Sequence, residues 1–128
     1  WKLKGAERVA IVTDAMSALG MPPGKYRLAG STVRVDETSA RLADGTLAGS
    51  ILRMDAAVRN LTAFTGCSLR EAVYSATAAP AHLVGAVNKG WLRPGADADI
   101  VLLNPRGEVQ GTIIKGEWID APGCQSHQ

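Results

Sequence analysis

The sequence predicts an α/β protein, and three observations lead to this prediction. An apolar run rich in β-branched residues extends from Val9 to Thr13 and ends on the carboxylate of Asp14, which is typical of a buried strand in a parallel sheet. Amphipathic segments with helical periodicity follow between residues 51 and 77. From Trp91 onward, short apolar runs separated by turn sequences indicate strands. A strand-and-helix part and an all-β part are therefore expected, with a boundary near residue 88.

Length and composition fit one ordinary domain with a hydrophobic core. The 128 residues are 46% hydrophobic and carry a formal net charge of +2. No run of basic residues alternates with aromatic residues, so we expect no nucleic-acid partner. No apolar stretch reaches the length of a membrane span, about 20 residues, so no membrane partner is expected either. The cysteines, Cys67 and Cys124, have no framework spacing, which predicts reduced thiols in a cytoplasmic protein.

Short strands are expected between the first strand and the helices. Tyr26–Leu28 and Ser31–Val35 are two extended runs, and Ala29-Gly30 between them is a candidate hairpin turn. A third run, Ala40–Leu42, leads into the glycine-rich loop Gly45–Ser50. This loop is expected to lie directly before a helix.

The first helix is predicted from about Ile51 to Thr65, because apolar residues at spacings of four, three and three form one stripe. Gly66 supplies a left-handed stop. The stripe consists of Met54, Val58, Leu61 and Phe64.

Two shorter helices follow. Ser68 and Glu71 fit a capping box, which predicts a second helix that runs to about Thr77. Pro80 is expected to open a third short helix, and Gly85 is expected to close it.

The C-terminal part is predicted to consist of three strands. Asp99–Leu103 indicates one strand, and Val109–Ile114 with Glu117–Ile119 indicates a hairpin that turns at Lys115-Gly116. Three strands leave two edges and one face uncovered, and a buried parallel strand needs parallel neighbours. Both parts are therefore expected to require partners that this stretch of sequence does not contain.

Asp14 is the main candidate for chemistry. It stands at the carboxyl end of the predicted strand, and this is the edge at which α/β enzymes bind and act on ligands. A carboxylate at this edge can act as a general base on water or coordinate a metal. The alternative is an aspartate that accepts backbone N–H bonds in the following turn.

The loop Gly45–Ser50 is the second candidate. Its two glycines, its free amides and the expected helix N-terminus would suit an anion or another polar ligand. No Lys follows the second glycine, so the loop is not a P-loop. The alternative is a connection in which the glycines only satisfy turn geometry.

Other polar residues have structural interpretations. Cys, His and acidic residues do not cluster at metal-ligand spacing, so no self-contained zinc site is expected. Asp97 and Asp99 lack the further acidic ligands of a calcium loop, and a turn at the entry of a strand is expected instead. His82 is expected at the surface of the third helix.

Five segments of the chain carry a resemblance to a known family, namely Val12–Met16, Gly45–Ser50, Met54–Leu61, Ala76–Ala81 and Lys89–Asp99. Together they resemble the N-acetylglucosamine-6-phosphate deacetylases of the amidohydrolase superfamily. The first two, at their mutual spacing, are specific to these deacetylases, and the last is shared across the superfamily. The resemblance extends to about residue 120 and covers the C-terminal third of the family's architecture.

The resemblance implies a fold. In this family a metal-dependent (β/α)₈ TIM barrel is joined to a small β-sandwich built from both chain ends. By resemblance, residues 1–88 are the C-terminal part of the barrel, and residues 9–14 are its last strand. Residues 89–120 are the C-terminal part of the sandwich, and a flexible tail, 121–128, follows.

The resemblance also implies an activity, the hydrolysis of N-acetylglucosamine 6-phosphate to glucosamine 6-phosphate and acetate by the complete enzyme. Asp14 would be the catalytic residue, taking a proton from metal-activated water and delivering it to the departing amine. It is also a candidate ligand of the metal, which is expected to be zinc, with iron or another divalent cation as alternatives. Leu47, Ala48 and Gly49 match the substrate-contacting loop.

Further expectations follow from the resemblance, and two alternatives remain open. The family's metal-binding Glu and His residues lie upstream of Trp1, so this chain alone is expected to hold no metal. The complete enzyme is expected to be a homodimer. One alternative is a non-catalytic, truncated or self-associating module of the family. The other is an amidohydrolase that acts on another cyclic amide or amino-sugar derivative.

Overall fold

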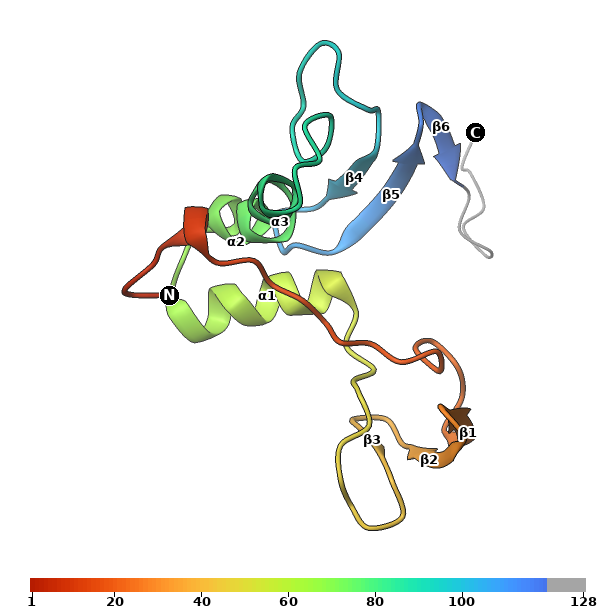
Figure 1. Ribbon diagram of the computed structural model, residues 1–128. Coiled ribbons are helices and arrows are strands. Elements are labelled where there is room, and N and C mark those ends of the chain that lie inside the picture. Colours follow the sequence, from red (N-terminus) through yellow and green to blue (C-terminus); the bar gives the residue numbers. More distant parts are fainter. Residues whose placement is uncertain (120–128) are drawn as a thin grey trace. The chain divides into compact units, whose positions relative to one another are not determined.

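The computed structural model describes residues 1–119, which belong to two compact units (Figure 1). Residues Val12–Ala57 form the unit that we call the Asp14 unit. Residues Trp1–Ile11, together with the chain from Val58 onward, form the helix–sheet unit. None of the helices in the described part of the chain has the length and apolar character needed to cross a membrane. The predicted tail, 121–128, lies outside the described residues.

The Asp14 unit contains a small antiparallel sheet with the order β1-β2-β3. Its strands are β1 (Gly24–Leu28), β2 (Ser31–Val35) and β3 (Ala40–Arg41). The predicted hairpin is confirmed, because β1 pairs with β2 along its whole length. Ala29 and Gly30 both have left-handed backbone, with φ of 46° and 86°. This is the geometry of the tight two-residue turn that matches the twist of a hairpin.

The core of the Asp14 unit lies where the chain after Asp14 meets this sheet. Alternation along β2 buries Val33 and Val35, while its other three residues are exposed. Met16 and Ala18, from the turn just after Asp14, pack with these valines and with Ala40 in one buried cluster. The position of the Asp14 segment is therefore set by packing as well as by hydrogen bonds.

Three helices follow, namely α1 (Met54–Thr65), α2 (Leu69–Ala76) and α3 (Ala78–Leu83). The predicted start of α1 at Ile51 is wrong by three residues. The amide of Ala57 donates to the Arg53 carbonyl over 2.9 Å, so Arg53 caps the helix. The preceding residues are not helical, because the amide of Leu52 donates to the hydroxyl of Ser50 over 3.1 Å.

The N-terminal ends of helices α2 and α3 follow local sequence rules. The capping box is confirmed, since Ser68 accepts from the Glu71 amide and Glu71 accepts from the Ser68 amide. Helix α3 begins at Ala78, two residues before the predicted start at Pro80. A proline is tolerated there because amides in the first turn of a helix need no partner within it.

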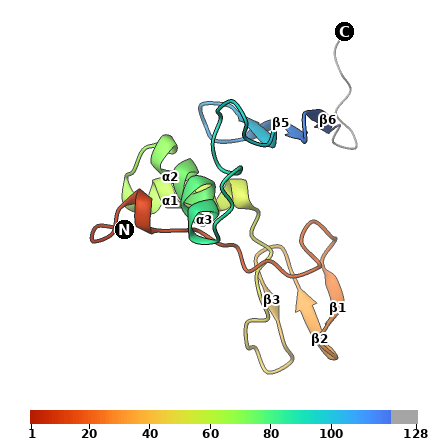
Figure 2. The same cartoon turned by 45° about the horizontal axis from the view of Figure 1, so that its top comes forward.

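Helices α2 and α3 lie side by side in the helix–sheet unit, and the short 3₁₀ helix η1 (Ala6–Arg8) packs against α2 (Figure 2). The buried hydroxyl of Ser75 donates to the carbonyl of Ala6 over 3.2 Å. The amide of Ile11 donates to the Ser75 carbonyl over 3.0 Å. One residue of α2 therefore fixes the N-terminal segment in this unit.

The prediction of a strand from Val9 to Asp14 is wrong for the described residues. The segment is extended at Val9, with φ of −121° and ψ of 116°, yet no strand of the described part of the chain pairs with it. Its nearest ladder contact is an isolated parallel bridge between Ala15 and Ser50. A parallel strand is defined by its neighbours, and an apolar run alone does not provide them.

The helix–sheet unit also contains an antiparallel sheet with the order β4-β5-β6, and its three strands were expected from the sequence. Its strands are β4 (Ile100–Leu103), β5 (Val109–Ile114) and β6 (Glu117–Ile119). The predicted turn is confirmed, with left-handed backbone at Lys115 and Gly116. The ring of Trp118 covers Gly111 so closely that a Cβ there would overlap it.

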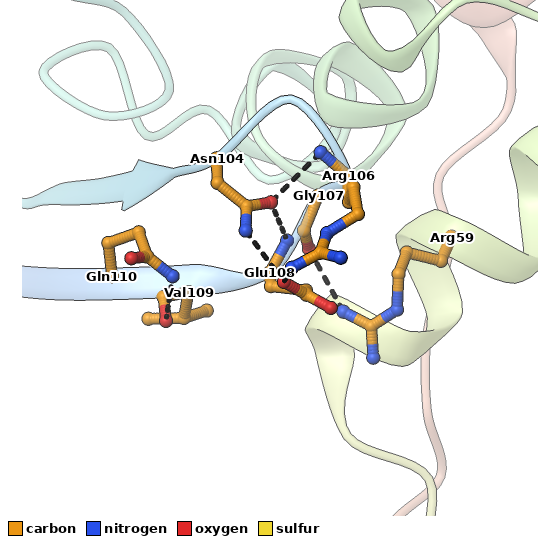
Figure 3. Close-up of polar contacts among 7 residues, drawn as sticks. All are labelled: Arg59, Asn104, Arg106, Gly107, Glu108, Val109 and Gln110. Atoms are coloured by element: carbon orange, nitrogen blue, oxygen red, sulfur yellow. Dashed lines mark hydrogen bonds and ion pairs between the residues drawn. The ribbon is translucent and has the colours of Figure 1, made fainter.

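The turn between β4 and β5 is tied to helix α1 in the same unit (Figure 3). The side-chain oxygen of Asn104 accepts from the amides of Arg106 and Glu108 over 2.9 and 3.0 Å. The guanidinium of Arg59 on α1 donates to the carbonyl of Gly107 over 2.9 Å. The turn therefore joins the small sheet to the helices of this unit.

The close packing around Gly90 gives a testable prediction about the stability of the helix–sheet unit. Its φ is 79°, and a Cβ would lie 2.8 Å from the Ala78 Cα and 2.9 Å from the Thr77 carbonyl oxygen. We expect Gly90→Ala to lower the free energy of unfolding by about 3 kcal/mol, because left-handed strain and a backbone clash add. Gly95 has a φ of 82° and open space around it, so Gly95→Ala should cost only about 1 kcal/mol. Urea unfolding of the full-length protein measures both, and equal losses would contradict this account.

Candidate functional site

The candidate site is centred on Asp14, whose side chain is exposed in the Asp14 unit. Its φ of 50° places the backbone in the left-handed region. For a residue other than glycine this conformation costs on the order of 1–2 kcal/mol, and aspartate is among the residues that tolerate it. Such a conformation persists only where the surrounding structure holds it.

Ser50 provides that surrounding structure. Its amide donates to the Asp14 carbonyl over 2.7 Å, and its own carbonyl accepts from the Met16 amide over 2.9 Å. Its hydroxyl donates to the carbonyl of Thr13. The chain is thus held before, at and after Asp14. These bonds bring together the two segments that sequence analysis selected independently, Asp14 and the loop ending at Ser50.

Gly49 lies in contact with the same segment. Its φ is 83°, and a Cβ at this position would lie 3.0 Å from the Asp14 carbonyl oxygen and 3.4 Å from the Met16 Cβ. Glycine is therefore required twice, once for its backbone conformation and once for its lack of a side chain. The close approach of the loop to Asp14 depends on it.

The rest of the loop folds back on β3. The amide of Ala48 donates to the Ala40 carbonyl over 2.9 Å, and that of Leu42 donates to the Thr46 carbonyl over 2.9 Å. Ala48 packs partly against the buried cluster, whereas the side chain of Leu47 is 61% exposed. The structure therefore places one exposed apolar side chain on the loop that contacts Asp14.

Most of the loop amides that were expected to be free for an anion have partners within the protein. The amides of Gly45, Ala48 and Ser50 donate to protein carbonyls, and the amide of Thr46 donates to the Asp44 carboxylate over 2.9 Å. The loop is also not a helix N-terminus, because α1 begins at Met54. The loop also presents the exposed apolar side chain of Leu47 to a ligand.

Asp97 and Asp99 are ion-paired and lie at the entry to β4, while the turn itself lies at residues 93–96. Lys89 binds Asp97 over 2.8 Å and also binds Asp99, which directly precedes β4. Hydrogen bonds from Lys89 to Asp97 and then to Asp99 raise the pKa of Lys89 to about 12. Lys89 and the Lys115 amide lower the pKa of Asp99. Sequence analysis missed the role of Lys89, which only the fold brings next to both carboxylates.

Within residues 1–119, no group of three or more His, Cys, Asp and Glu residues could hold a metal ion. His82 is exposed on α3, and Cys67 is a half-buried free thiol. Cys124 lies outside the described residues. Asp14 is thus a single carboxylate, and the described residues do not by themselves fit a catalytic metal, which typically takes three protein ligands.

Comparison with known proteins shows the family to which this chain belongs. Residues 3–119 match the amidohydrolase family. The chain belongs to this family.

Within the amidohydrolases, the chain is similar in sequence to deacetylases of amino-sugar phosphates. The chain is 45% identical over 116 residues to the N-acetylglucosamine-6-phosphate deacetylase of Lysinibacillus sphaericus, covering 91% of this chain and 30% of that relative. It is 43% identical over 112 residues to the N-acetylgalactosamine-6-phosphate deacetylase of Escherichia coli O157:H7, covering 87% of this chain and 30% of that relative. This amidohydrolase chain therefore spans about a third of the length of these relatives.

The fold of this chain is also similar to that of a solved deacetylase structure. The N-acetylglucosamine-6-phosphate deacetylase of Thermotoga maritima superposes with a TM-score of 0.84 at 38% sequence identity. The match covers 91% of this chain and 32% of that chain. The α/β class predicted from the sequence is confirmed, while the barrel and the division at residue 88 stay predictions.

The turn between β2 and β3 in the Asp14 unit gives a pH-dependent prediction. Asp36 accepts hydrogen bonds from Thr38 and Ser39, and these lower its pKa from 3.8 to about 2. A carboxyl whose pKa is lower in the folded state stabilises the fold above its unfolded pKa, and this contribution is lost as the pH falls. We expect the stability difference between wild type and Asp36→Asn to shrink from pH 6 to pH 3. Urea unfolding at both pH values measures it, and a constant difference would contradict the prediction.

Proposed function

We propose that this chain is part of an enzyme that hydrolyses N-acetylglucosamine 6-phosphate to glucosamine 6-phosphate and acetate. The observation that carries the proposal is the joining of Asp14 to the loop Gly45–Ser50 within one compact unit. These are the two segments whose sequences, at their mutual spacing, most specifically resemble the deacetylases. The names of the relatives support the same reaction.

In this proposal Asp14 is the catalytic residue and acts first as a base and then as an acid. The carboxylate accepts a proton from water while the water oxygen attacks the acetamide carbonyl carbon. The protonated carboxyl then delivers this proton to the amide nitrogen as the carbon–nitrogen bond breaks, so acetate and the free amine leave. The exposure of the side chain leaves it accessible to a bound sugar.

A divalent metal is part of the proposed complete enzyme, with zinc expected first and iron or another divalent cation as alternatives. When bound, such a metal supplies a polarised carbonyl or an activated water. Asp14 is the ligand that this chain would contribute, and the described residues do not by themselves form the rest of a ligand set.

Leu47, Ala48 and Gly49 are proposed to contact the substrate. They belong to the loop that lies against Asp14, and Leu47 presents an apolar side chain to solvent. Apolar surface near a few fixed polar groups is typical of sites that bind small molecules. The loop would hold the sugar while the carboxylate acts on its acetamide group.

A second candidate substrate is N-acetylgalactosamine 6-phosphate, because a relative at 43% identity bears that name. The two sugars differ only in the configuration at C4, so both fit the chemistry proposed for Asp14. Rates of acetate release from the two phosphates by the full-length protein separate the candidates. We expect a higher kcat/KM for the gluco sugar, and a higher value for the galacto sugar would establish the alternative.

The proposal includes a homodimer in the cytoplasm. The free thiol of Cys67 is consistent with a reducing compartment. The homodimer is an expectation from the family alone.

Asp14→Asn tests the proposed role directly. The amide side chain keeps the size and the hydrogen bonding of the residue but no longer accepts a proton, so we expect turnover to fall by about 10²- to 10⁴-fold. Acetate release by the full-length protein measures it, and circular dichroism checks the fold. Asp36→Asn, which changes an exposed aspartate of the same unit, is the matched control. Turnover of Asp14→Asn near that of wild type would refute the assignment.

A further inference from the structure

We propose that Ser50 is a positioning residue that fixes the backbone at Asp14 and thereby aims its carboxylate. This inference rests on the proposed catalytic role of Asp14. Ser50 touches the segment at three successive places, namely the carbonyls of Thr13 and Asp14 and the amide of Met16. These contacts lie inside the Asp14 unit and join parts of the chain 37 residues apart.

The serine hydroxyl is used twice. It donates its proton to the Thr13 carbonyl, and its oxygen accepts from the Leu52 amide over 3.1 Å. A hydroxyl on a short side chain provides both a donor and acceptor lone pairs. Alanine at this position would leave a part-buried carbonyl and an amide without these partners, while the backbone bonds of residue 50 would remain.

The orientation of the Asp14 side chain depends on these contacts because its backbone is left-handed. Relaxation of φ to the extended region would redirect the bond from Cα to Cβ and swing the carboxylate away. Gly49 lies so near the Asp14 carbonyl that a Cβ at this position would crowd the carbonyl oxygen. The absence of a side chain at Gly49 therefore allows the loop to come this close. Small errors in the placement of a reacting group lower rates strongly.

The test uses Ser50→Ala in the full-length protein, with acetate release from N-acetylglucosamine 6-phosphate as the assay. We expect kcat to fall about 10- to 100-fold with little change in KM, because the carboxylate is misplaced while the substrate contacts remain. Ser50→Thr keeps the hydroxyl and should restore kcat to within a few-fold of wild type. Ser39→Ala, which removes another hydroxyl of the same unit, is the matched control and should keep wild-type rates.

A double-mutant cycle distinguishes positioning from general structural damage. If Ser50 acts through Asp14, then Ser50→Ala should cause no further loss in an Asp14→Asn background. Should Ser50→Ala fail to fold, Ser50→Cys replaces it, since a thiol is only a weak donor, and the same fall in kcat is expected. A wild-type kcat in the tested variant, or an equal loss in both backgrounds, would overturn the inference.

The outcomes also separate this inference from the proposed function. Loss of turnover in Asp14→Asn with full activity in Ser50→Ala would refute the positioning role alone. Full activity in Asp14→Asn would refute the proposed catalytic role itself.

Discussion

The left-handed backbone at Asp14 is the constraint on which the candidate site depends. An aspartate adopts this conformation only against a steric cost, and the cost must be offset by contacts from elsewhere in the unit. Ser50 supplies hydrogen bonds, and Gly49 supplies the space for a close approach. The buried cluster that contains Met16 and Val33 anchors the adjacent turn to the sheet. The carboxylate is thereby exposed on a segment that is fixed on both sides.

The same contacts explain other local features. Because Ser50 bonds back to the Asp14 segment, the chain does not enter α1 directly, and the helix begins only at Met54. The amides of Gly45, Thr46 and Ala48 are used within the loop and by β3, and the loop presents the apolar side chain of Leu47 to solvent. The loop is therefore built to approach an aspartate closely and to leave it accessible. This arrangement suits a carboxylate that exchanges protons with a bound substrate.

Local features were predictable from the sequence and non-local ones were not. The capping box at Ser68 and the hairpin turn at Lys115 depend on residues within a few positions of one another, and both were predicted correctly. The apolar run before Asp14 predicts a strand that the described residues do not form, because an apolar run does not reveal whether a neighbouring strand pairs with it. Asp14 and the loop were each selected from the sequence. The bonds of Ser50 that join them were missed, because a left-handed φ at an aspartate leaves no mark in composition or periodicity.

The central claim is that Asp14 is held where its carboxylate meets the acetamide group of an amino-sugar phosphate. A crystal structure of full-length Asp14→Asn with N-acetylglucosamine 6-phosphate tests it most directly. We expect the side chain of residue 14 within hydrogen-bond reach, about 2.6–3.2 Å, of the amide nitrogen or of a water beside the carbonyl carbon. The loop Gly45–Ser50 should lie against the sugar, with residue 14 still left-handed. A sugar bound elsewhere, or an extended residue 14 whose side chain points away from the acetamide group, would contradict the account.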